Sequence, residues 1–411
     1  MVVGAHGCGT EGDVSDDDAG TPLDGPPPGA SATGDGLRRR RRRRLGCGGI
    51  AVAVLAVGAA GAGWAVYAKL DGNITADEAA AAELARYDKE RPTALVRGAQ
   101  NILLIGSDSR SGDGNARYGR DSGTERSDTT ILLHLAAGRD SATAVSLPRD
   151  LMVDVPGCRR PDGSRTAPVL AQFNHAYEVG GSACSVRTVE KLTGIRLDHH
   201  VVVDFQGFKK LVDALDGVEV CLRAPVDDED AGLRLPAGRV TLDGEQALGY
   251  VRARKSLGDG SDTDRMDRQQ RFLGALVNKV QSNDVLLNPV KLYPVLDAAT
   301  SSLTTDPDLA SLRGLYDLVR GLRGIPTERV QFLTVPREAY AGDVNRDQLV
   351  EPDAERLFTR LRTDEPVAIG AAGEREEPTG AGGAREPGPG RLGESPAPTF
   401  SGNTAAEDIC G

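Results

Sequence analysis

Apolar residues in the middle of the chain follow two different spacings. Short apolar runs bounded by polar or turn-forming residues predict buried strands, and they occupy residues 100–105, 131–135, 142–147, 201–203, 218–222 and 330–335. Apolar residues spaced three and four apart predict helices, and they occupy residues 183–193, 206–215, 264–282, 284–303 and 308–322. Because strands alternate with helices, the pattern predicts an α/β sheet covered by helices on both faces.

One segment near the N-terminus is long and apolar enough to cross a membrane. Residues 38–44 are consecutive arginines, and residues 45–67 carry no charge. A helix of that length spans about 35 Å, which exceeds a hydrocarbon core of about 30 Å. The arginines should stay in the cytoplasm, so the chain after the span is expected outside it. A cleaved signal peptide is the alternative, but its apolar region would be shorter.

These patterns divide the chain into five parts. We predict a disordered cytoplasmic tail, a single transmembrane helix in the cell membrane, a helical linker, one extracytoplasmic domain and a disordered C-terminal tail. Their bounds are residues 1–44, 45–67, 68–97, 98–362 and 363–411. Both tails are rich in Gly, Asp or Pro and have few large apolar side chains. They therefore cannot bury enough apolar surface to offset the entropy lost on ordering.

Charge and cysteine content narrow the classes of protein further. The net charge of −11 argues against non-specific binding to nucleic acid, and we expect no nucleic-acid partner. Four cysteines follow the span, at positions 158, 184, 221 and 410, and they allow three pairings. Cys158 and Cys184 flank one loop-rich stretch and are the first choice for a bridge. Cys410 could bond to Cys221, but the sequence does not decide this pairing.

Charged residues cluster where predicted strands begin or end. Asp108 and Arg110 follow the first strand, Arg126 and Asp128 precede the second, and Arg149 and Asp150 follow the third. Ligands of α/β sheets bind at strand ends, so we expect these side chains to line a site.

A second group of arginines comes later in the chain. If residues 251–254 are extended, Arg252 and Arg254 point to the same side. The predicted helix that follows carries a polar stripe on one face, made of Arg265, Arg268 and Gln269 and continued by Phe272. The alternative is an ordinary surface helix with these charges turned to solvent.

Arginines beside aspartates suit phosphate chemistry. A guanidinium grips phosphate oxygens with two hydrogen bonds and stays charged. Carboxylates among the arginines can hold Mg²⁺, and a pyrophosphate ester as substrate would explain both sets of residues. An arginine–aspartate salt-bridge lattice without a ligand is the alternative.

Taken in order and behind one membrane helix, these motifs resemble the LytR-CpsA-Psr family, ligases of wall polymers in Gram-positive and actinobacterial cells. The resemblance runs from about Gln100 to Phe272. It is carried by Ile105-Gly-Ser-Asp-Ser-Arg, Glu125-Arg-Ser-Asp-Thr, Ser146-Leu-Pro-Arg-Asp, Phe173-Asn-His-Ala-Tyr with Gly180-Gly181, Tyr250-Val-Arg-Ala-Arg, and Asp262-Thr-Asp-Arg with Arg268-Gln-Gln.

The resemblance implies a mixed central β-sheet flanked by helices, with an apolar groove for a polyprenyl chain. It implies a phosphotransferase that moves a glycopolymer, such as a teichoic acid, from a polyprenyl-pyrophosphate carrier to a peptidoglycan hydroxyl through a phosphodiester link. The implied partners are the lipid-linked glycan donor, the peptidoglycan acceptor and membrane lipid.

The resemblance also assigns residue roles. Asp108 and Asp128 would hold Mg²⁺, with Mn²⁺ as an alternative ion. The residues expected to act in catalysis are Arg126, Arg149, Arg252, Arg254, Asp262 and Arg265. The residues expected to add to pyrophosphate binding are Arg110, Arg268 and Gln269. Asp264 departs from the family pattern, in which a small residue is common, and adds a negative charge beside the site.

The sequence leaves the reaction partly open. It contains neither a GxSxG elbow nor a cysteine with a plausible histidine partner, so we expect no covalent nucleophile. A general base would be Asp150 or Asp262. A polyprenyl-pyrophosphate phosphatase would use the same site with water as acceptor. A membrane-bound transcriptional regulator is less consistent, because residues 1–44 show no helix-turn-helix pattern and are acidic before Arg38.

Overall fold

The computed structural model describes residues 55–107, 127–229, 231–253, 262–282, 288–370, 399–407 and 410. The chain divides into two compact units, residues 1–63 and 64–411. Residues 55–63 of the first unit and residues 64–73 of the second are helical. No helix among the described residues combines the length and the apolar character needed to cross a membrane. Residues 45–54 of the predicted span lie outside the described part, as does the tail at 1–44.

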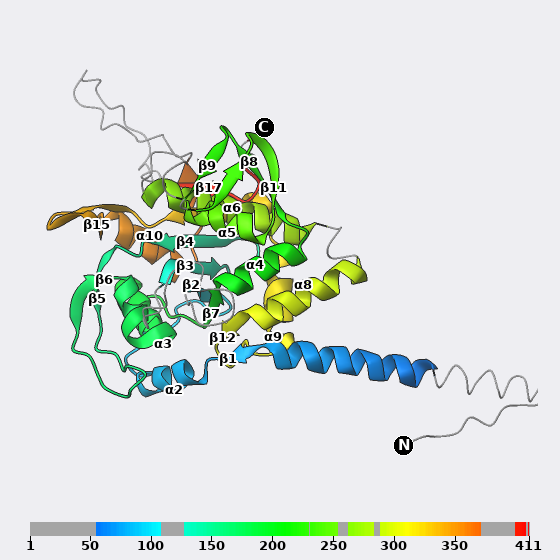
Figure 1. The fold of residues 1–411 in the computed structure, drawn as a ribbon. Helices are drawn as coiled ribbons and strands as arrows, with labels where there is room; N and C mark the ends of the chain where they lie inside the picture. Colours follow the sequence, from blue (N-terminus) through cyan, green and yellow to red (C-terminus); the bar gives the residue numbers. More distant parts are fainter. Residues whose placement is uncertain are drawn as a thin grey trace, which may run out of the picture. The chain divides into compact units, whose positions relative to one another are not determined.

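The centre of the second unit is a sheet in which the described residues form nine strands (Figure 1). Their order across the sheet is β1 (Thr75–Ala76), β12 (Leu303–Thr305), β7 (His199–Asp204), β2 (Gln100–Ser107), β3 (Ser127–Leu135), β4 (Ala142–Leu147), β13 (Val330–Thr334), β17 (Thr399–Thr404) and β16 (Ala368–Gly370). Strands β2 and β7 are parallel, as are β4 and β13, whereas β3 is antiparallel to both of its neighbours. The sheet is therefore mixed, as predicted.

Helices cover both faces of this sheet because its central strands are apolar on both sides. Along β2, Leu103 and Ile105 join one core, while Ile102 and Leu104 join the other. Successive side chains of a strand point to opposite faces, so a continuous apolar run needs a cover on each. The first face is covered by α2 (Glu78–Arg86), α3 (Asn174–Thr193) and α10 (Asp353–Arg362). The second is covered by α6 (Asp262–Gln281) and α9 (Leu312–Arg323).

The remaining helices and hairpins extend the domain beside the sheet. Helices α4 (Phe205–Ala214), α5 (Gly244–Arg252) and α8 (Pro289–Ser302) follow the order of the chain, and η2 (Thr327–Arg329) is a single 3₁₀ turn. Strands β8 (Val218–Leu222) and β11 (Gly238–Leu242) form a hairpin that carries a second hairpin, β9 (Val226–Asp228) with β10 (Leu233–Leu235). Two further hairpins pair β5 (Met152–Val155) with β6 (Val169–Gln172) and β14 (Arg337–Tyr340) with β15 (Asp343–Leu349).

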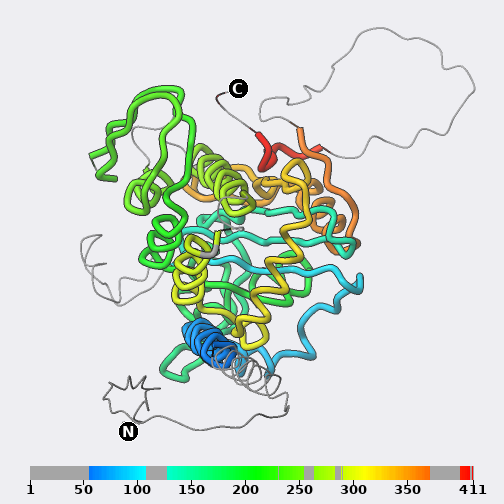
Figure 2. The backbone as a smooth tube through the Cα atoms, turned by 90° about the vertical axis from the view of Figure 1, so that its right-hand side faces the viewer, coloured from blue at the N-terminus to red at the C-terminus, as the bar shows by residue number. Residues whose placement is uncertain are grey.

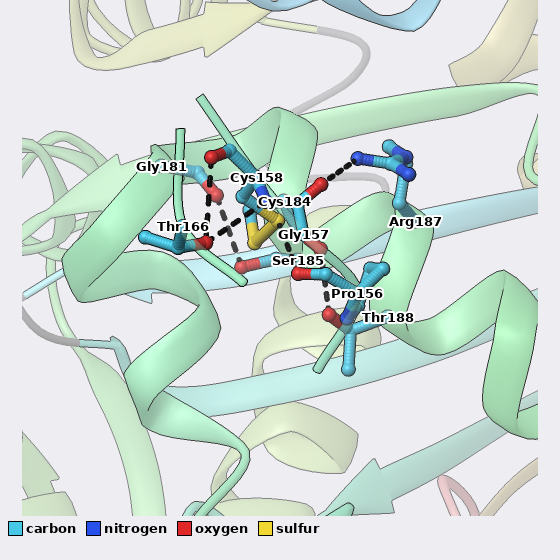
Figure 3. Close-up of a disulfide and its surroundings, with 9 residues drawn as sticks. All are labelled: Pro156, Gly157, Cys158, Thr166, Gly181, Cys184, Ser185, Arg187 and Thr188. Carbon is cyan, nitrogen blue, oxygen red and sulfur yellow. Dashed lines mark hydrogen bonds between the residues drawn. A yellow bond between two sulfur atoms is a disulfide. The ribbon is translucent and has the colours of Figure 1, made fainter. Parts of the chain in front are cut away.

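Helix α3 is longer than the predicted 183–193 because a glycine pair interrupts its apolar pattern. The backbone leaves helical geometry at Gly180 and Gly181, and Gly181 has a φ of 58°. The Cys158–Cys184 disulfide lies against this kink (Figure 3). A Cβ added at Gly180 would lie 2.7 Å from Cys184 Cβ, so only glycine fits there. The structure confirms this first-choice cysteine pairing.

The prediction of disorder for residues 363–411 is wrong at two places. Strands β16 and β17 extend the sheet beyond β13, and Figure 2 shows the red C-terminal segment beside the orange chain that carries β16. Phe400 is buried in the core, and Asn278 Nδ2 donates to Ala405 O at 2.6 Å. One buried aromatic ring and the hydrogen bonds of a short strand hold this segment, whereas averaged composition conceals them. Residues 371–398 lie outside the described part.

The same segment is also held covalently. Cys410 is bonded to Cys221 of β8, 189 residues away in sequence. This bridge, which the sequence left undecided, joins the end of the chain to the β8–β11 hairpin.

The linker contains less helix than predicted. Between residues 74 and 97, α2 is the only helix that the structure describes. Asp77 caps α2 by accepting from Ala80 N at 3.0 Å, and it also accepts from Ser182 Oγ. His200 Nε2 lies 3.4 Å from the same carboxylate. Burial opposes ionisation of Asp77, but the hydrogen bonds from His200, Ser182 and Ala80 outweigh it and lower its pKa to about 2.

We expect replacement of both Cys221 and Cys410 by serine to release the C-terminal strand. The disulfide limits the freedom of the unfolded chain over a long loop, and β17 makes only a few pairs of its own. Amide hydrogen exchange should show lost protection at residues 399–405 with little change in β2 or β3. The Cys158→Ser/Cys184→Ser variant is the control, in which β17 should stay protected. Unchanged protection of β17 after loss of the Cys221–Cys410 bridge would contradict this role.

We expect Asp77→Asn to remove a pH-dependent part of the stability. The lowered pKa means that ionised Asp77 stabilises the fold above its unfolded pKa, and that this contribution disappears as the pH falls through about 2. For a partly exposed carboxylate the effect should be about 1 kcal/mol near neutral pH. Urea unfolding of both proteins at several pH values measures it. A difference between them that does not shrink in acid would show that Asp77 acts only as an uncharged cap.

Candidate active site

Polar side chains converge where five strands of the central sheet begin or end at one edge. The registers pair Ser107, at the end of β2, with Ser127 at the start of β3 and with Asp204 at the end of β7. On the other side of β3, Thr334 at the end of β13 pairs with Ser146 of β4. Antiparallel β3 begins where its neighbours end, so the ends of β2, β4, β7 and β13 lie at the same edge as the start of β3. Of the residues predicted at strand ends, Asp128, Arg149 and Asp150 lie at this edge.

Arg149 is held between two carboxylates at this edge. Its Nη1 donates to Asp128 Oδ1 at 2.7 Å, and its Nε donates to Asp150 Oδ2 at 3.2 Å. The side chains of Arg149, Asp128 and Asp150 are 23%, 33% and 22% exposed. The guanidinium is thus fixed in direction but still reachable from solvent, which is what a phosphate-binding arginine requires.

Asp150 is engaged through both of its oxygens. Gln172 Nε2 donates to Oδ1 at 2.7 Å, while Arg149 occupies Oδ2. A carboxylate held in this way is suited to orienting Arg149 and poorly suited to accepting a substrate proton. The geometry therefore argues against Asp150 as the general base. Asp262 begins α6, but its side chain lies outside the described part.

The polar stripe of α6 faces inward, so the alternative of a surface helix is wrong. Arg265 and Arg268 are only 5% and 6% exposed, and Phe272 is buried behind them. Arg268 donates through Nη2 to Ala253 O, and Gln269 Nε2 donates to Val251 O at 3.2 Å. Burial lowers the pKa of Arg268, although nearby Tyr250 and acidic groups oppose this. Arg268 and Gln269 therefore position the end of α5, a role that the sequence did not predict.

Arg252 lies in a helix and not in the extended segment assumed for residues 251–254. A capping box at Asp243 starts α5, which continues to Arg252. The Arg252 guanidinium carbon lies 4.7 Å from the centre of the Phe205 ring. Phe205 directly follows the end of β7, so Arg252 lies at the same edge as Arg149. A cation over an aromatic face is held in place and keeps its charge.

The structure adds one arginine that the sequence analysis missed. Arg337 forms an ion pair with Asp347 and donates to Thr263 Oγ1 at 2.7 Å. Asp347 N in turn donates to Asp150 O at 3.1 Å. These contacts connect the β14–β15 hairpin to both the start of α6 and the chain beside Arg149.

A repeated motif could have revealed Arg337. Leu147-Pro148-Arg149 lies at the end of β4, and Val335-Pro336-Arg337 lies at the end of its parallel neighbour β13. Parallel neighbours bring such residues to the same edge. Gln270, also missed, donates to Ser146 Oγ at 3.1 Å and to Thr334 Oγ1 at 3.0 Å, and ties α6 to both strands.

Several predicted site residues cannot be placed. Asp108, Arg110, Arg126 and Arg254 lie outside the described residues. Within the described part, no group of three or more histidine, cysteine or acidic side chains is arranged to hold a metal ion. The described half of the predicted metal pair, Asp128, directly follows Ser127, whose partner Ser107 directly precedes Asp108 in the chain.

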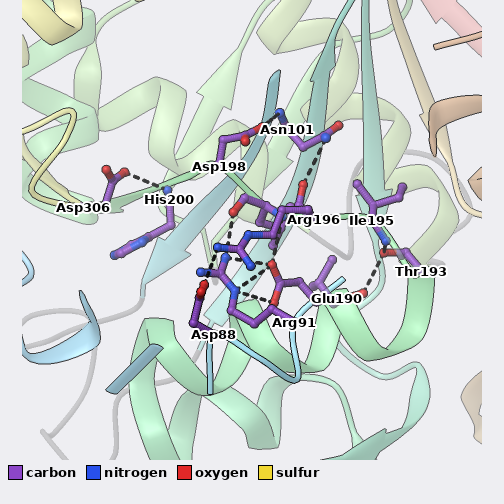
Figure 4. Close-up of polar contacts among 12 residues, drawn as sticks. Asp88, Arg91, Asn101, Glu190, Thr193, Ile195, Arg196, Asp198, His200 and Asp306 are labelled. Atoms are coloured by element: carbon purple, nitrogen blue, oxygen red, sulfur yellow. Dashed lines mark hydrogen bonds and ion pairs between the residues drawn. The ribbon is translucent and has the colours of Figure 1, made fainter. Parts of the chain in front are cut away.

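A polar network at the opposite edge of the sheet is internally satisfied (Figure 4). Arg91 holds Glu190 through three hydrogen bonds of 2.8, 2.9 and 3.1 Å. Asp306 accepts from His200 N at 3.1 Å and lies 3.1 Å from His199 Nδ1. Arg91, His199, His200 and Asp306 border a cavity of about 450 Å³ between α2 and the start of β7. Both histidines are thus engaged within this network.

Comparison with known proteins supplies the family. The model of the LytR_cpsA_psr family matches residues 67–363, more than half of the chain. The chain is 37% identical over 271 residues to cell wall biosynthesis protein LcpA of Corynebacterium glutamicum, which covers 60% of this chain and 51% of that protein. It is 35% identical over 207 residues to polyisoprenyl-teichoic acid–peptidoglycan teichoic acid transferase TagU of Enterococcus faecalis, which covers 50% of this chain and 61% of that protein.

Solved structures agree on the fold. A LytR-Csp2A-Psr enzyme from Actinomyces oris matches with a TM-score of 0.52 and 22% identity, covering 66% of this chain and 93% of that one. The chain spans between about half and two thirds of the length of LcpA and TagU. With the family model matched across the sheet, the arginine-bearing edge and α6, the chain belongs to the LytR_cpsA_psr family.

Proposed function

We propose that the chain is a phosphotransferase that moves a glycopolymer from a polyprenyl-pyrophosphate carrier to a peptidoglycan hydroxyl. The observation that carries this proposal is Arg149, fixed between Asp128 and Asp150 at the edge where Arg252 and the start of α6 also lie. The names of relatives support it, because TagU of Enterococcus faecalis is a polyisoprenyl-teichoic acid–peptidoglycan teichoic acid transferase.

The arginines of this edge would bind and neutralise the pyrophosphate. Phosphoryl transfer depends mainly on positioning and on neutralising charge on the transferred group. Arg149 presents a fixed guanidinium to solvent, and Arg252 is held over Phe205. Arg265 would approach from the first turns of α6. Arg110, Arg126 and Arg254 would complete the set, while Arg268 and Gln269 hold the end of α5.

The proposed reaction exchanges one phosphorus–oxygen bond for another. The acceptor hydroxyl oxygen attacks the glycan-side phosphorus, and the bond from that phosphorus to the bridging oxygen breaks. The lipid leaves as a monophosphate and the glycan stays joined through a phosphodiester. The hydroxyl proton passes to a carboxylate, for which Asp262 is our candidate because Asp150 is fully engaged.

The donor set at this edge fits Mg²⁺, with Mn²⁺ as an alternative. Arg149 contacts only Oδ1 of Asp128, and the carboxylate is a third exposed. Mg²⁺ commonly uses one or two carboxylates together with substrate phosphates and several waters. Asp128 and Asp108 would hold the ion, which would neutralise charge on the pyrophosphate.

We further propose that residues 45–67 cross the cell membrane once, with the N-terminus in the cytoplasm and the domain outside. The seven arginines at 38–44 support this orientation. Leu55, Val57 and Trp64 belong to the helical residues, and each is more than 70% exposed, as lipid-facing residues would be. Disulfides at Cys158–Cys184 and Cys221–Cys410 suit an oxidising location outside the cytoplasm.

A direct test incubates the full chain in detergent with a polyprenyl-pyrophosphate-linked saccharide, Mg²⁺ and peptidoglycan fragments. Mass spectrometry should find a phosphodiester conjugate together with lipid monophosphate. Lipid monophosphate without a conjugate, whichever fragment is supplied, would indicate the phosphatase reaction. No release of lipid monophosphate would contradict both reactions.

We expect Arg149→Ala to lower turnover by about 100-fold or more, because loss of one fixed charge-stabilising donor commonly costs that much. Arg149→Lys keeps the charge but loses the planar fork, so its turnover should be intermediate. Arg234→Ala is a matched control, since Arg234 lies on β10 with its side chain 75% exposed. Circular dichroism checks that each variant is folded. Full turnover by folded Arg149→Ala would remove Arg149 from the site.

We expect chelation of divalent ions to abolish turnover and Mg²⁺ to restore it. Asp128→Asn should raise the Mg²⁺ concentration needed for half-maximal turnover, because an amide binds this ion less strongly than a carboxylate. Asp154→Asn serves as the control, since Asp154 is exposed on β5. Turnover that persists in chelator, or an unchanged Mg²⁺ requirement in Asp128→Asn, would contradict the metal assignment.

A further inference from the structure

Residues 64–73 lie alongside α8, and the two helices run in the same direction. Lys69 Nζ donates to Tyr293 Oη at 3.0 Å, and Asn73 Nδ2 donates to Asp297 Oδ1 at 3.0 Å. In both pairs the two residues lie 224 positions apart in sequence. Four residues along one helix therefore match four residues along the other. The same separation brings Val290, in the first turn of α8, level with Val66.

Helix α9 begins where this helical segment ends. Leu312 N donates to Asp71 Oδ1 at 2.8 Å. Near the other end of α9, a Cβ added at Gly321 would lie 3.4 Å from Arg139, in the turn between β3 and β4. Helix α9 therefore runs over this face of the sheet to the turn between β3 and β4, with Leu318 and Leu322 packed on the core. In Figure 2 the blue helix is seen nearly end-on, and the gold chain that includes α9 leads upward from beside it.

The outer side of α9 is basic and aromatic. Arg313, Tyr316, Arg320 and Arg323 follow the spacing of one helical face, and all four are exposed. Tyr316 is 61% exposed, and Asp317 is the only acidic residue of this helix. Exposed apolar area continues on α8, where Val290 is 81% exposed. Arginines beside aromatic and apolar side chains on one helical face are typical of helices at a lipid interface.

The heights of these side chains match the layers of a bilayer. The predicted span ends at Tyr67, so Val290, level with Val66, would lie at the edge of the hydrocarbon. Asp71 follows four residues later, about 6 Å farther out along a helix. The headgroup layer is about 5–8 Å thick on each side. The start of α9 and its arginines would therefore lie among headgroup phosphates.

We infer that Val290 and Tyr293 of α8, with Arg313, Tyr316, Arg320 and Arg323 of α9, form a juxtamembrane surface that docks on anionic phospholipid headgroups. This inference rests on the membrane anchor proposed above. Docking holds the domain in one orientation on the membrane that also carries the lipid-linked donor. The matching chemistry is that of a phosphate-rich surface above hydrocarbon, because the apolar residues lie at the inner level and the arginines at the outer one.

Tryptophan quenching in nanodiscs tests this docking on the full chain. Trp64 is the only tryptophan of the chain, so the unmodified protein reports on the anchor. The variant Trp64→Phe/Tyr316→Trp moves the reporter to the juxtamembrane surface. The control Trp64→Phe/Val344→Trp places it on β15, 82% exposed and far from α9 in Figure 1. Two kinds of nanodisc are compared, one made of phosphatidylglycerol and one of phosphatidylcholine. Each contains brominated lipid as the quencher.

We expect the reporter at position 316 to be quenched in phosphatidylglycerol and the reporter at 344 to be spared. Adding Arg320→Glu and Arg323→Glu should reduce quenching at 316 to the level of 344. Each arginine near an anionic surface changes the ratio of docked to undocked domain by about five-fold, so the double reversal should lower it by more than about 25-fold. The reversal should leave turnover in detergent unchanged, because neither arginine lies at the active-site edge.

The other outcomes separate this inference from the proposed function. Quenching of Trp64 with equal signals at 316 and 344 would overturn the docking and leave the anchored transferase intact. Equal quenching at 316 in both lipids, unaffected by charge reversal, would overturn the assignment to anionic headgroups. Absence of quenching at Trp64 itself would overturn the anchor and the docking together, without bearing on the transfer reaction measured in detergent.

Discussion

The structure depends on gathering several arginines at one edge of a sheet without unfolding that edge. Like charges at short range repel, and buried guanidinium groups lose hydration. The fold offsets these costs locally. Asp128 and Asp150 flank Arg149, Asp347 pairs with Arg337, and Ala253 O accepts from buried Arg268. Each of these partners accepts hydrogen bonds from an arginine and fixes its position. The partly exposed Arg149 can still receive an anionic ligand.

This arrangement separates two tasks that the sequence cannot tell apart. Arg149 is nearly a quarter exposed and can meet a ligand, while Arg268 is buried and positions backbone. Arg337 also acts through others, because it connects Asp347 to Thr263 at the start of α6. Substitution of each of these arginines would therefore lower activity for its own reason. The exposed guanidinium of Arg149 can bind charge, while Arg268 and Arg337 maintain the shape that presents it.

The sequence predicts the parts of the fold that repeat a simple pattern. Apolar runs such as 142–147 coincide with strands because both faces of the sheet are covered. The periodicity of residues 264–282 predicts helix α6, whereas the spacing of its arginines leaves their inward direction open. Local pattern fails where a few contacts decide. Phe400 and the Cys221–Cys410 bridge order a segment dominated by glycine and proline, and Gly180-Gly181 conceals half of α3. At the site, pairing of Arg149 with Asp128 depends on strand register, which no single segment contains.

The helical segment at residues 64–73 leads directly into the central sheet, without a long loop between them. After Asn73 the chain forms β1, which pairs in parallel with β12, and Asp77 N donates to Thr305 O at 2.7 Å. Strand β12 pairs with β7, and β7 ends at Asp204 on the active-site edge. Three neighbouring strands, β1, β12 and β7, therefore connect the segment at residues 64–73 to the edge that holds Arg149. If that segment is fixed in a membrane, a sheet this continuous leaves the site few orientations, and the direction from which a lipid-linked donor enters becomes a property of the fold.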